Sequence, residues 1–187
     1  MPLIECTLIE GYSALTRRLV SERLTDAACS AIGADANFVT VTIKEVAPEN
    51  YMRGRIPRAP AEAPLQSDQI VHLYLQAMEA RDLGAAAEFL GDTFEIICPG
   101  DRRFITLAEF ADWAQPRYRS ISKSFLSTDV SFHGGDATVF CHGTLSGVWH
   151  DGSTFVGIRF VDRFALTDGR ITSQQIWNDM AEVISLS

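Results

Sequence analysis

The sequence predicts an α+β protein in two parts, a small βαβ unit followed by a cone-shaped α+β domain with a curved antiparallel sheet. In residues 1–56, one long helical pattern lies between two strand patterns. Residues 67–187 instead place three helical patterns before a long run of alternating strands, which must curl to cover the helices. Residues 57–66 are rich in proline and suit a semi-extended linker. We therefore expect two domains joined by this linker.

The βαβ unit begins with a strand over residues 3–10 that stops at Gly11. Ser13 is the expected N-cap of the following helix, and Gly33 is its expected stop. A second strand is expected over residues 38–46. The helix is predicted from apolar residues at helical spacing, namely Leu15, Leu19, Val20, Leu24, Ala28, Ala31 and Ile32.

Pro2 lies directly before the first strand, behind Met1. Removal of Met1 would turn its nitrogen into a secondary amine, and α-amino groups have pKa values of about 7.7–8.0 that fall where apolar residues exclude water. Such an amine can act as a general base. The alternative is that Pro2 is a common second residue that tolerates methionine removal and has no chemical role.

Pro2, Gly11, the long helix, the strand ending at Val46 and the pair Asn50-Tyr51 before a glycine-containing hairpin resemble the 4-oxalocrotonate tautomerase family. The resemblance spans residues 2–55. It implies that Pro2 is the catalytic base and that Tyr51 belongs to the pocket wall.

The same resemblance implies two substrate-binding arginines, but Tyr12 and Thr40 occupy those positions. Neither side chain grips a carboxylate as a guanidinium does, so a substrate with one carboxylate is favoured over a dicarboxylate. Arg53 and Arg55, in the hairpin after Tyr51, either compensate for the missing arginines or are solvated loop charges.

Composition and charge narrow the class of protein. Of 187 residues, 47% are hydrophobic, yet no apolar run approaches 18 residues and no charged-then-apolar leader precedes Pro2, so we expect neither a membrane span nor secretion. The first 58 residues carry no net charge, so the remainder carries the whole −8, which argues against nucleic acid and anionic membranes as partners. Four scattered cysteines, without metal-binding spacing, predict reduced, mostly buried thiols in a cytoplasmic protein rather than a disulfide or zinc framework. We expect neither a metal nor a cofactor.

The second domain is predicted to begin with a helix at Ser67, then a short helix over residues 83–90 and a strand over residues 93–98. Thr106 and Glu109 form a capping box that starts a third helix. The first helix is predicted from one apolar stripe, which consists of Ile70, Val71, Tyr74, Leu75 and Met78. Four strands follow, at residues 124–133, 137–149, 154–165 and 170–181.

This order of elements resembles the nuclear transport factor 2-like superfamily, in particular its SnoaL-like polyketide cyclases and ketosteroid isomerases, over residues 65–183. The ketosteroid isomerase site, carried over, puts its tyrosine at Tyr74, its base at Cys98 and its protonated carboxyl at Phe160. A thiol is a poor substitute for a carboxylate base and Phe160 offers no hydrogen bond. The resemblance therefore argues against steroid chemistry.

Three further polar residues are candidates for the cone-domain pocket. Asp162 ends an apolar stripe of residues 154, 156, 158 and 160, and a buried carboxylate is a recognised pointer to function. The alternatives are an ion pair with Arg159 or Arg163, or a position at the rim of the sheet. His142, in mid-strand, either reaches the same cavity or is a structural histidine. Asn178 is the polar candidate on the last strand, although a one-residue change of register would turn it outward.

The favoured function is a cofactor-independent tautomerase or isomerase of a small enol or α-keto acid. One alternative places a cyclase or isomerase in the cone domain, with Tyr74 and Asp162. Another is a small apolar ligand-binding protein whose N-terminal unit serves assembly. A βαβ unit of this length is small for an independent core, so we expect a homo-oligomer, a hexamer or a trimer.

Overall fold

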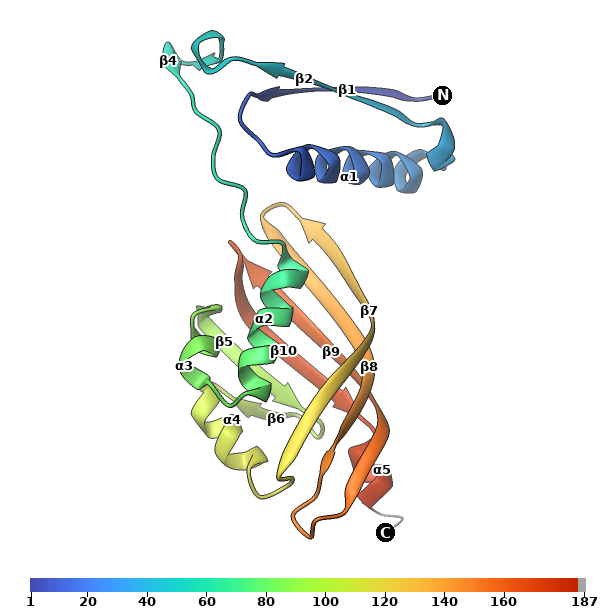
Figure 1. Ribbon diagram of the computed structural model, residues 1–187, viewed down its shortest axis with the longest axis vertical. Coiled ribbons are helices and arrows are strands. Elements are labelled where there is room, and N and C mark those ends of the chain that lie inside the picture. The colour runs from blue at the N-terminus through green and yellow to red at the C-terminus, as the bar shows by residue number, and fades with distance from the viewer. Residues whose placement is uncertain (185–187) are drawn as a thin grey trace. The chain divides into compact units, whose positions relative to one another are not determined.

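The computed structural model describes residues 1–184 and divides into two compact units, residues 1–64 and the part of the chain from Leu65 onward. Figure 1 shows a single helix against a two-stranded sheet in the first unit, and helices against one face of a large curved sheet in the second. The predicted fold class is confirmed.

The first unit is the predicted βαβ arrangement. Strand β1 (Leu3–Ile9) pairs in parallel with β2 (Thr40–Val46), in register from Leu3 opposite Thr40 to Ile9 opposite Val46. Helix α1 (Ala14–Ile32) connects them. The Ser13 hydroxyl accepts a hydrogen bond from the Thr16 amide at 3.1 Å, and Gly33 ends the helix with a φ of 66°, so both predicted caps are confirmed.

Short elements before and after β2 complete the first unit. The 3₁₀ turns η1 (Ala36–Phe38) and η2 (Pro48–Asn50) flank β2. The hairpin of β3 (Met52–Arg53) and β4 (Ile56–Pro57) turns through Gly54 and Arg55, both at positive φ.

The first unit has almost no interior of its own. Among residues 1–64, all of which the structure describes, Ile9 is the only buried hydrophobic residue. Leu15 and Ile32 of α1 remain 76% and 69% exposed. A unit that buries so little apolar surface gains little stability from its own contacts.

The second unit begins with α2 (Ser67–Glu79), α3 (Leu83–Ala87) and β5 (Leu90–Cys98). It continues with β6 (Arg102–Phe104) and α4 (Leu107–Ala114). Four strands follow, β7 (Ser120–His133), β8 (Asp136–Val148), β9 (Thr154–Thr167) and β10 (Arg170–Asn178), before α5 (Met180–Ile184).

The large sheet has the strand order β6-β5-β10-β9-β8-β7. All neighbours are antiparallel except β5 and β10, which run in parallel. Register shifts interrupt β7, β9 and β10, and Gly157 takes a φ of 82° within the irregularity of β9. Such bulges bend strands, which suits the curvature in Figure 1.

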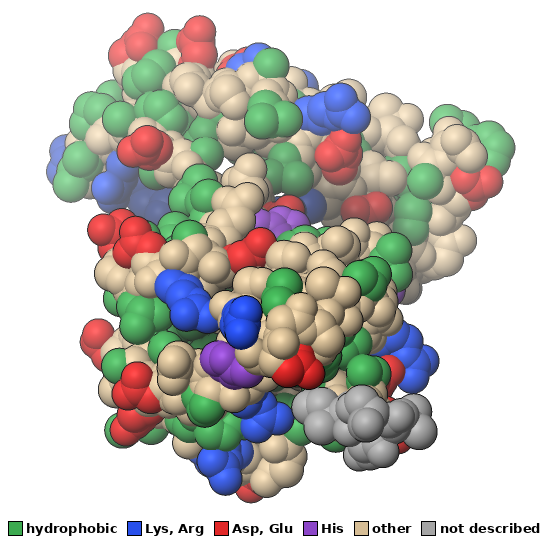
Figure 2. Space-filling view, turned by 60° about the horizontal axis from the view of Figure 1, so that its bottom comes forward, with side chains coloured by type: hydrophobic (Ala, Val, Ile, Leu, Met, Phe, Trp, Pro, Cys, Tyr) green, Lys and Arg blue, Asp and Glu red, His purple; other side chains and the backbone are tan. Residues whose placement is uncertain are grey.

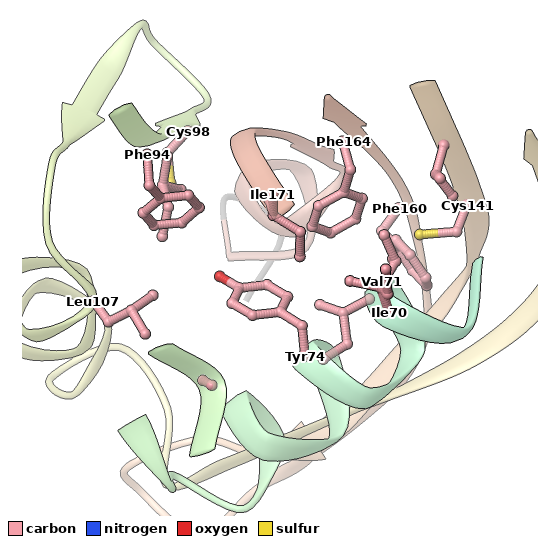
Figure 3. Packing of buried hydrophobic residues seen from close by; sticks show 14 of the residues in the cluster. Ile70, Val71, Tyr74, Phe94, Cys98, Leu107, Cys141, Phe160, Phe164 and Ile171 are labelled. Carbon is pink, nitrogen blue, oxygen red and sulfur yellow. The ribbon is translucent and has the colours of Figure 1, made fainter. Parts of the chain in front are cut away.

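The core of this unit lies between α2 and the concave face of the sheet. Ile70, Val71, Tyr74 and Leu75 are buried, as the predicted stripe requires. Figure 3 shows Tyr74 projecting from α2 among side chains of the sheet, and its ring meets Phe164 edge-on at a centroid distance of 5.9 Å.

Several predicted boundaries are wrong in the second unit. The second helix ends before residue 90, because Leu90 already belongs to β5. The sequence pattern gave no sign of β6, a three-residue strand paired with the end of β5. The last strand stops at Asn178 rather than residue 181, since the Asn178 side chain accepts a hydrogen bond from the Met180 amide at 3.1 Å where α5 begins.

Candidate functional site

Pro2 occupies the entry to β1 and is half-buried. Its carbonyl accepts a hydrogen bond from the Thr40 amide at 3.0 Å, which anchors it beside the start of β2. Thr40, where the resemblance implied an arginine, is therefore the neighbour of Pro2 across the sheet.

Tyr51, Arg53 and Arg55 lie at the other end of the same sheet. They follow β2, which ends at Val46 opposite Ile9, whereas Pro2 precedes the opposite end of β1. At about 3.3 Å per residue the strands separate the two groups by roughly 20 Å. One chain therefore does not bring Pro2 together with these three residues. Tyr12 lies at the far end with them.

The second unit contains a cavity of about 380 Å³ between its helices and the concave face of the sheet. Its lining is mostly apolar and includes four aromatic side chains, Phe110, Trp113, Tyr118 and Phe160. Polar groups reach it from β7, β10 and the segments around α4, among them Lys123 and Gln174. A mostly apolar cavity with a few convergent polar groups is the usual form of a small-molecule site.

A buried polar chain lies beside this cavity. The Tyr74 hydroxyl donates to Gln174 Oε1 at 2.9 Å, and Gln174 Nε2 donates to Asp162 Oδ2 at 3.3 Å. The ammonium of Lys123 forms an ion pair with the same carboxylate oxygen and lies 4.2 Å from the centre of the Phe160 ring. Asp162 is completely buried, whereas the Lys123 side chain keeps 20% of its surface exposed.

The buried surroundings keep the Tyr74 hydroxyl protonated. Burial raises the pKa of the Tyr74 hydroxyl far above its ordinary value, and the charges of Asp162 and Cys98 raise it further. Oδ1 of Asp162 has no hydrogen-bond partner among residues 1–184, so this oxygen can accept a hydrogen bond. Tyr74 is a donor at neutral pH, and Asp162 is the group with acceptor capacity to spare.

Cys98 and Phe160 both line the cavity, as does Asn178. Burial raises the pKa of the Cys98 thiol to about 11; the charge of Asp162 also raises it, whereas Arg117 and Arg102 lower it. The thiol is therefore neutral near pH 7 and cannot replace a carboxylate base. Asn178 uses its carbonyl oxygen to cap α5, which leaves its amide group for other contacts.

The expectation that His142 reaches the cavity is wrong. His142 is exposed and borders a shallow hollow on the other face of the sheet, next to Trp177 and Val161. The reason is the alternation of β8, in which Cys141 and Gly143 are buried and His142 points the opposite way.

The prediction of an apolar stripe that ends at Asp162 is correct only in part. Ile158, Phe160 and Asp162 are buried, but Val156 is 82% exposed because the irregularity at Gly157 reverses the alternation before it. The partner of Asp162 is Lys123 on β7, while Arg159 pairs with Asp179 at 2.6 Å.

Lys123 and Gln174 were missed as site residues. Lys123 lay just outside the predicted strand, although its spacing of two from Ile121 places both on one face of β7. The alternation of β10 did not indicate Gln174, because the register shift of this strand places the buried residues Ile171 and Gln174 three positions apart instead of two. Trp113, Arg102 and Arg117 also line the cavity.

Two negative findings apply to residues 1–184. No helix there combines the length and apolar composition needed to cross a bilayer. In the same range, no three His, Cys, Asp or Glu side chains are grouped so that they could hold a metal ion.

Comparison with known proteins separates the two units. Residues 2–56 match the tautomerase enzyme family, and residues 71–174 match the SnoaL-like domain family. A probable tautomerase of Ralstonia nicotianae is 36% identical over 64 residues, which is 34% of this chain and 91% of that protein.

Solved structures resemble the second unit in fold. An NTF2-like protein of unknown function from Burkholderia pseudomallei has a TM-score of 0.53 at 17% identity, covering 64% of this chain and 95% of that one. A putative SnoaL-like polyketide cyclase from Jannaschia sp. CCS1 has a TM-score of 0.52 at 14% identity, covering 68% and 96%. The chain thus belongs to the tautomerase enzyme family through its N-terminal unit and to the SnoaL-like domain family through its C-terminal unit.

Proposed function

We propose that the N-terminal unit is a cofactor-independent tautomerase of a small enol or α-keto acid, with the nitrogen of Pro2 as its base. The observation that carries the proposal is the position of Pro2 at the entry to β1, in a unit that matches the tautomerase enzyme family from residue 2. Met1 must be removed first, because a prolyl nitrogen acylated by methionine has no lone pair for proton transfer.

The reaction consumes nothing. The prolyl nitrogen accepts the proton of the enol hydroxyl, and the oxygen electron pair forms the carbonyl while the carbon–carbon double bond becomes nucleophilic at its far carbon. The resulting ammonium of Pro2 then returns the proton to that carbon. A secondary amine with a pKa near or below about 8 can perform both steps at neutral pH.

Tyr51, Arg53 and Arg55 serve this reaction from a second copy of the chain. Within one chain they lie about 20 Å from Pro2 along the sheet, too far for a shared small substrate. A neighbouring copy that brings its hairpin to the start of β1 supplies the aromatic wall and the positive charge that offsets the developing oxyanion.

The substrate carries one carboxylate in this proposal. Thr40 lies beside Pro2, and its hydroxyl cannot bind a carboxylate as a guanidinium does.

The four cysteines are free thiols, which supports the proposed reducing, cytoplasmic location.

The test is the enol-to-keto conversion of phenylpyruvate by untagged protein whose intact mass shows loss of Met1. A general base typically contributes 10²–10⁴-fold, so Pro2→Ala should lose most of the activity, while the linker variant Pro64→Ala keeps it. A variant with one residue inserted between Met1 and Pro2 retains the ring but acylates the nitrogen, and should be as inactive as Pro2→Ala. Activity of Pro2→Ala within about threefold of wild type would falsify the proposal.

A second candidate function is favoured by the cavity of the second unit. A cyclase or isomerase acting on a ring compound would use Asp162 as the base. Because Asp162 is fully buried and does not itself line the cavity, it would exchange protons with the substrate through Lys123, which does line it. Tyr74 acts in this scheme through Gln174, because its hydroxyl donates to that side chain. Ring-compound turnover retained in Pro2→Ala and lost in Asp162→Asn would assign the chemistry to this cavity.

A further inference from the structure

The cavity of the second unit gathers positive charge in a chain whose net charge is −8. Three cationic side chains line it, Lys123, Arg102 and Arg117, against one acidic lining residue, Glu79. From Leu65 onward the sequence holds nine Lys or Arg and sixteen Asp or Glu, so a third of the basic residues border this one cavity. Figure 2 shows blue and red side chains interspersed over the surface in view, in contrast to the three cations and one acid that line the cavity.

Lys123 has hydrogen-bonding capacity left after its ion pair. An ammonium has three N–H donors, and the structure records one carboxylate partner for it, Asp162. Its side chain is 20% exposed and lines the cavity, beside the face of the Phe160 ring. A largely desolvated cation binds an anionic oxygen more strongly than a surface lysine does.

The two arginines have aromatic neighbours instead of carboxylate partners. The guanidinium carbon of Arg117 lies 4.3 Å from the centre of the Trp113 ring, and that of Arg102 lies 5.8 Å from it. Among residues 1–184 neither guanidinium forms an ion pair with a carboxylate. Both side chains are exposed, so their charge favours the approach of an anion from solvent.

We propose that this cavity binds an apolar, ring-bearing organic anion, whose ring packs among Phe110, Trp113 and Tyr118 and whose carboxylate or enolate oxygen accepts a hydrogen bond from Lys123. The cavity volume of about 380 Å³ suits a compound of one or two rings. The site rests on the cavity of the second candidate function but requires no reaction there, and it is independent of Pro2.

The test uses two probes that differ in charge and share a ring system, 2-naphthoate and 2-naphthylmethanol, titrated calorimetrically into the full chain. We expect 2-naphthoate to bind at least tenfold more tightly, a difference of about 1.4 kcal/mol. Quenching of Trp113 fluorescence should accompany binding, because Trp113 lines the cavity and the other two tryptophans do not.

Variants that remove charges from the cavity, compared with a surface control, identify the cation that binds the anion. Lys123→Gln combined with Asp162→Asn removes one charge of each sign and leaves no bare buried charge, and it should reduce the preference for the anion to the part that Arg102 and Arg117 supply. Arg117→Gln should weaken 2-naphthoate binding severalfold without changing that of 2-naphthylmethanol. Lys44→Gln is the matched control, since Lys44 is the only other lysine and pairs at the surface with Glu5.

Three outcomes overturn the proposal: no binding of 2-naphthoate, equal affinity for both probes, or a preference that is undiminished in the double variant. Binding retained in Pro2→Ala separates this site from the tautomerase proposal, so either one can fail alone.

Discussion

At the scale of single residues, the ion pair of Lys123 and Asp162 is the most consequential contact. Asp162 is completely buried, so removing its partner leaves an uncompensated charge in the interior. Lys123→Met should lower the free energy of unfolding by about 3–5 kcal/mol, measured by urea denaturation. The exposed Lys44→Met should change it by less than about 0.5 kcal/mol.

The double variant Lys123→Met/Asp162→Asn shows whether the stability loss of Lys123→Met comes from a buried charge or from lost packing. If the buried charge is responsible, the double variant should recover much of the stability that Lys123→Met loses, because neither partner is charged. A double variant as unstable as the sum of the two single ones would show that the loss comes from packing.

The residue scale also explains why the site was only partly predictable. Asp162 is predicted from the alternation of its strand, whereas Tyr74, Cys98 and Phe160 come from the resemblance to ketosteroid isomerases. Their partners come from distant segments: Lys123 is 39 residues from Asp162, and Gln174 is 100 residues from Tyr74. Such contacts depend on strand register, and the irregularities of β9 and β10 change that register in a way that no period-two pattern shows.

At the scale of elements, the capping box of helix α4 shows how much a local interaction contributes to the free energy of unfolding. The Glu109 amide donates to the Thr106 hydroxyl and the Thr106 amide donates to the Glu109 carboxylate, both at 3.2 Å. Thr106→Ala should therefore lower the free energy of unfolding by about 1 kcal/mol, while Thr106→Ser keeps most of it. The midpoint of urea denaturation measures the change, and the exposed strand residue Thr93 gives a control substitution to alanine. An unchanged midpoint for Thr106→Ala would show that packing alone fixes α4.

Elements with local signals were predicted well. The capping residues Ser13, Gly33 and Thr106 act within one turn of the chain, so the sequence alone contains the interaction. The strand β6 and the parallel pairing of β5 with β10 carry no local signal, because each exists through a partner elsewhere in the sheet. Tertiary contact overrode the predicted helix end at residue 90 for the same reason.

At the scale of the whole molecule, both units present surfaces suited to a second copy. In the first, the sheet has two strands only, so each has an unpaired edge within the described chain, and Leu15 and Ile32 are exposed. In the second, Val161 lies opposite His142 on one side and Trp177 on the other, on the outer face of the sheet. Val161 and Trp177 are 40% and 49% exposed.

We therefore predict an obligate homo-oligomer, a hexamer if a two-fold and a three-fold contact both operate and a trimer if only the latter does. Light scattering on dilute protein measures the mass. Trp177→Glu should reduce a hexamer to a smaller assembly, whereas Leu73→Glu on α2 should not change the mass. A folded, stable 20.6 kDa monomer would contradict the prediction and weaken the tautomerase proposal with it.

The separation of Pro2 from the hairpin of Tyr51, Arg53 and Arg55 has a genetic consequence. If each site takes Pro2 from one copy and the hairpin from another, Pro2→Ala and the double variant Arg53→Ala/Arg55→Ala damage different halves of a site. Coexpressed in one cell, two inactive alleles should complement each other, since random mixing leaves both halves intact in about a quarter of the sites. Coexpressed alleles that stay as inactive as either one alone would place all the working groups in a single chain.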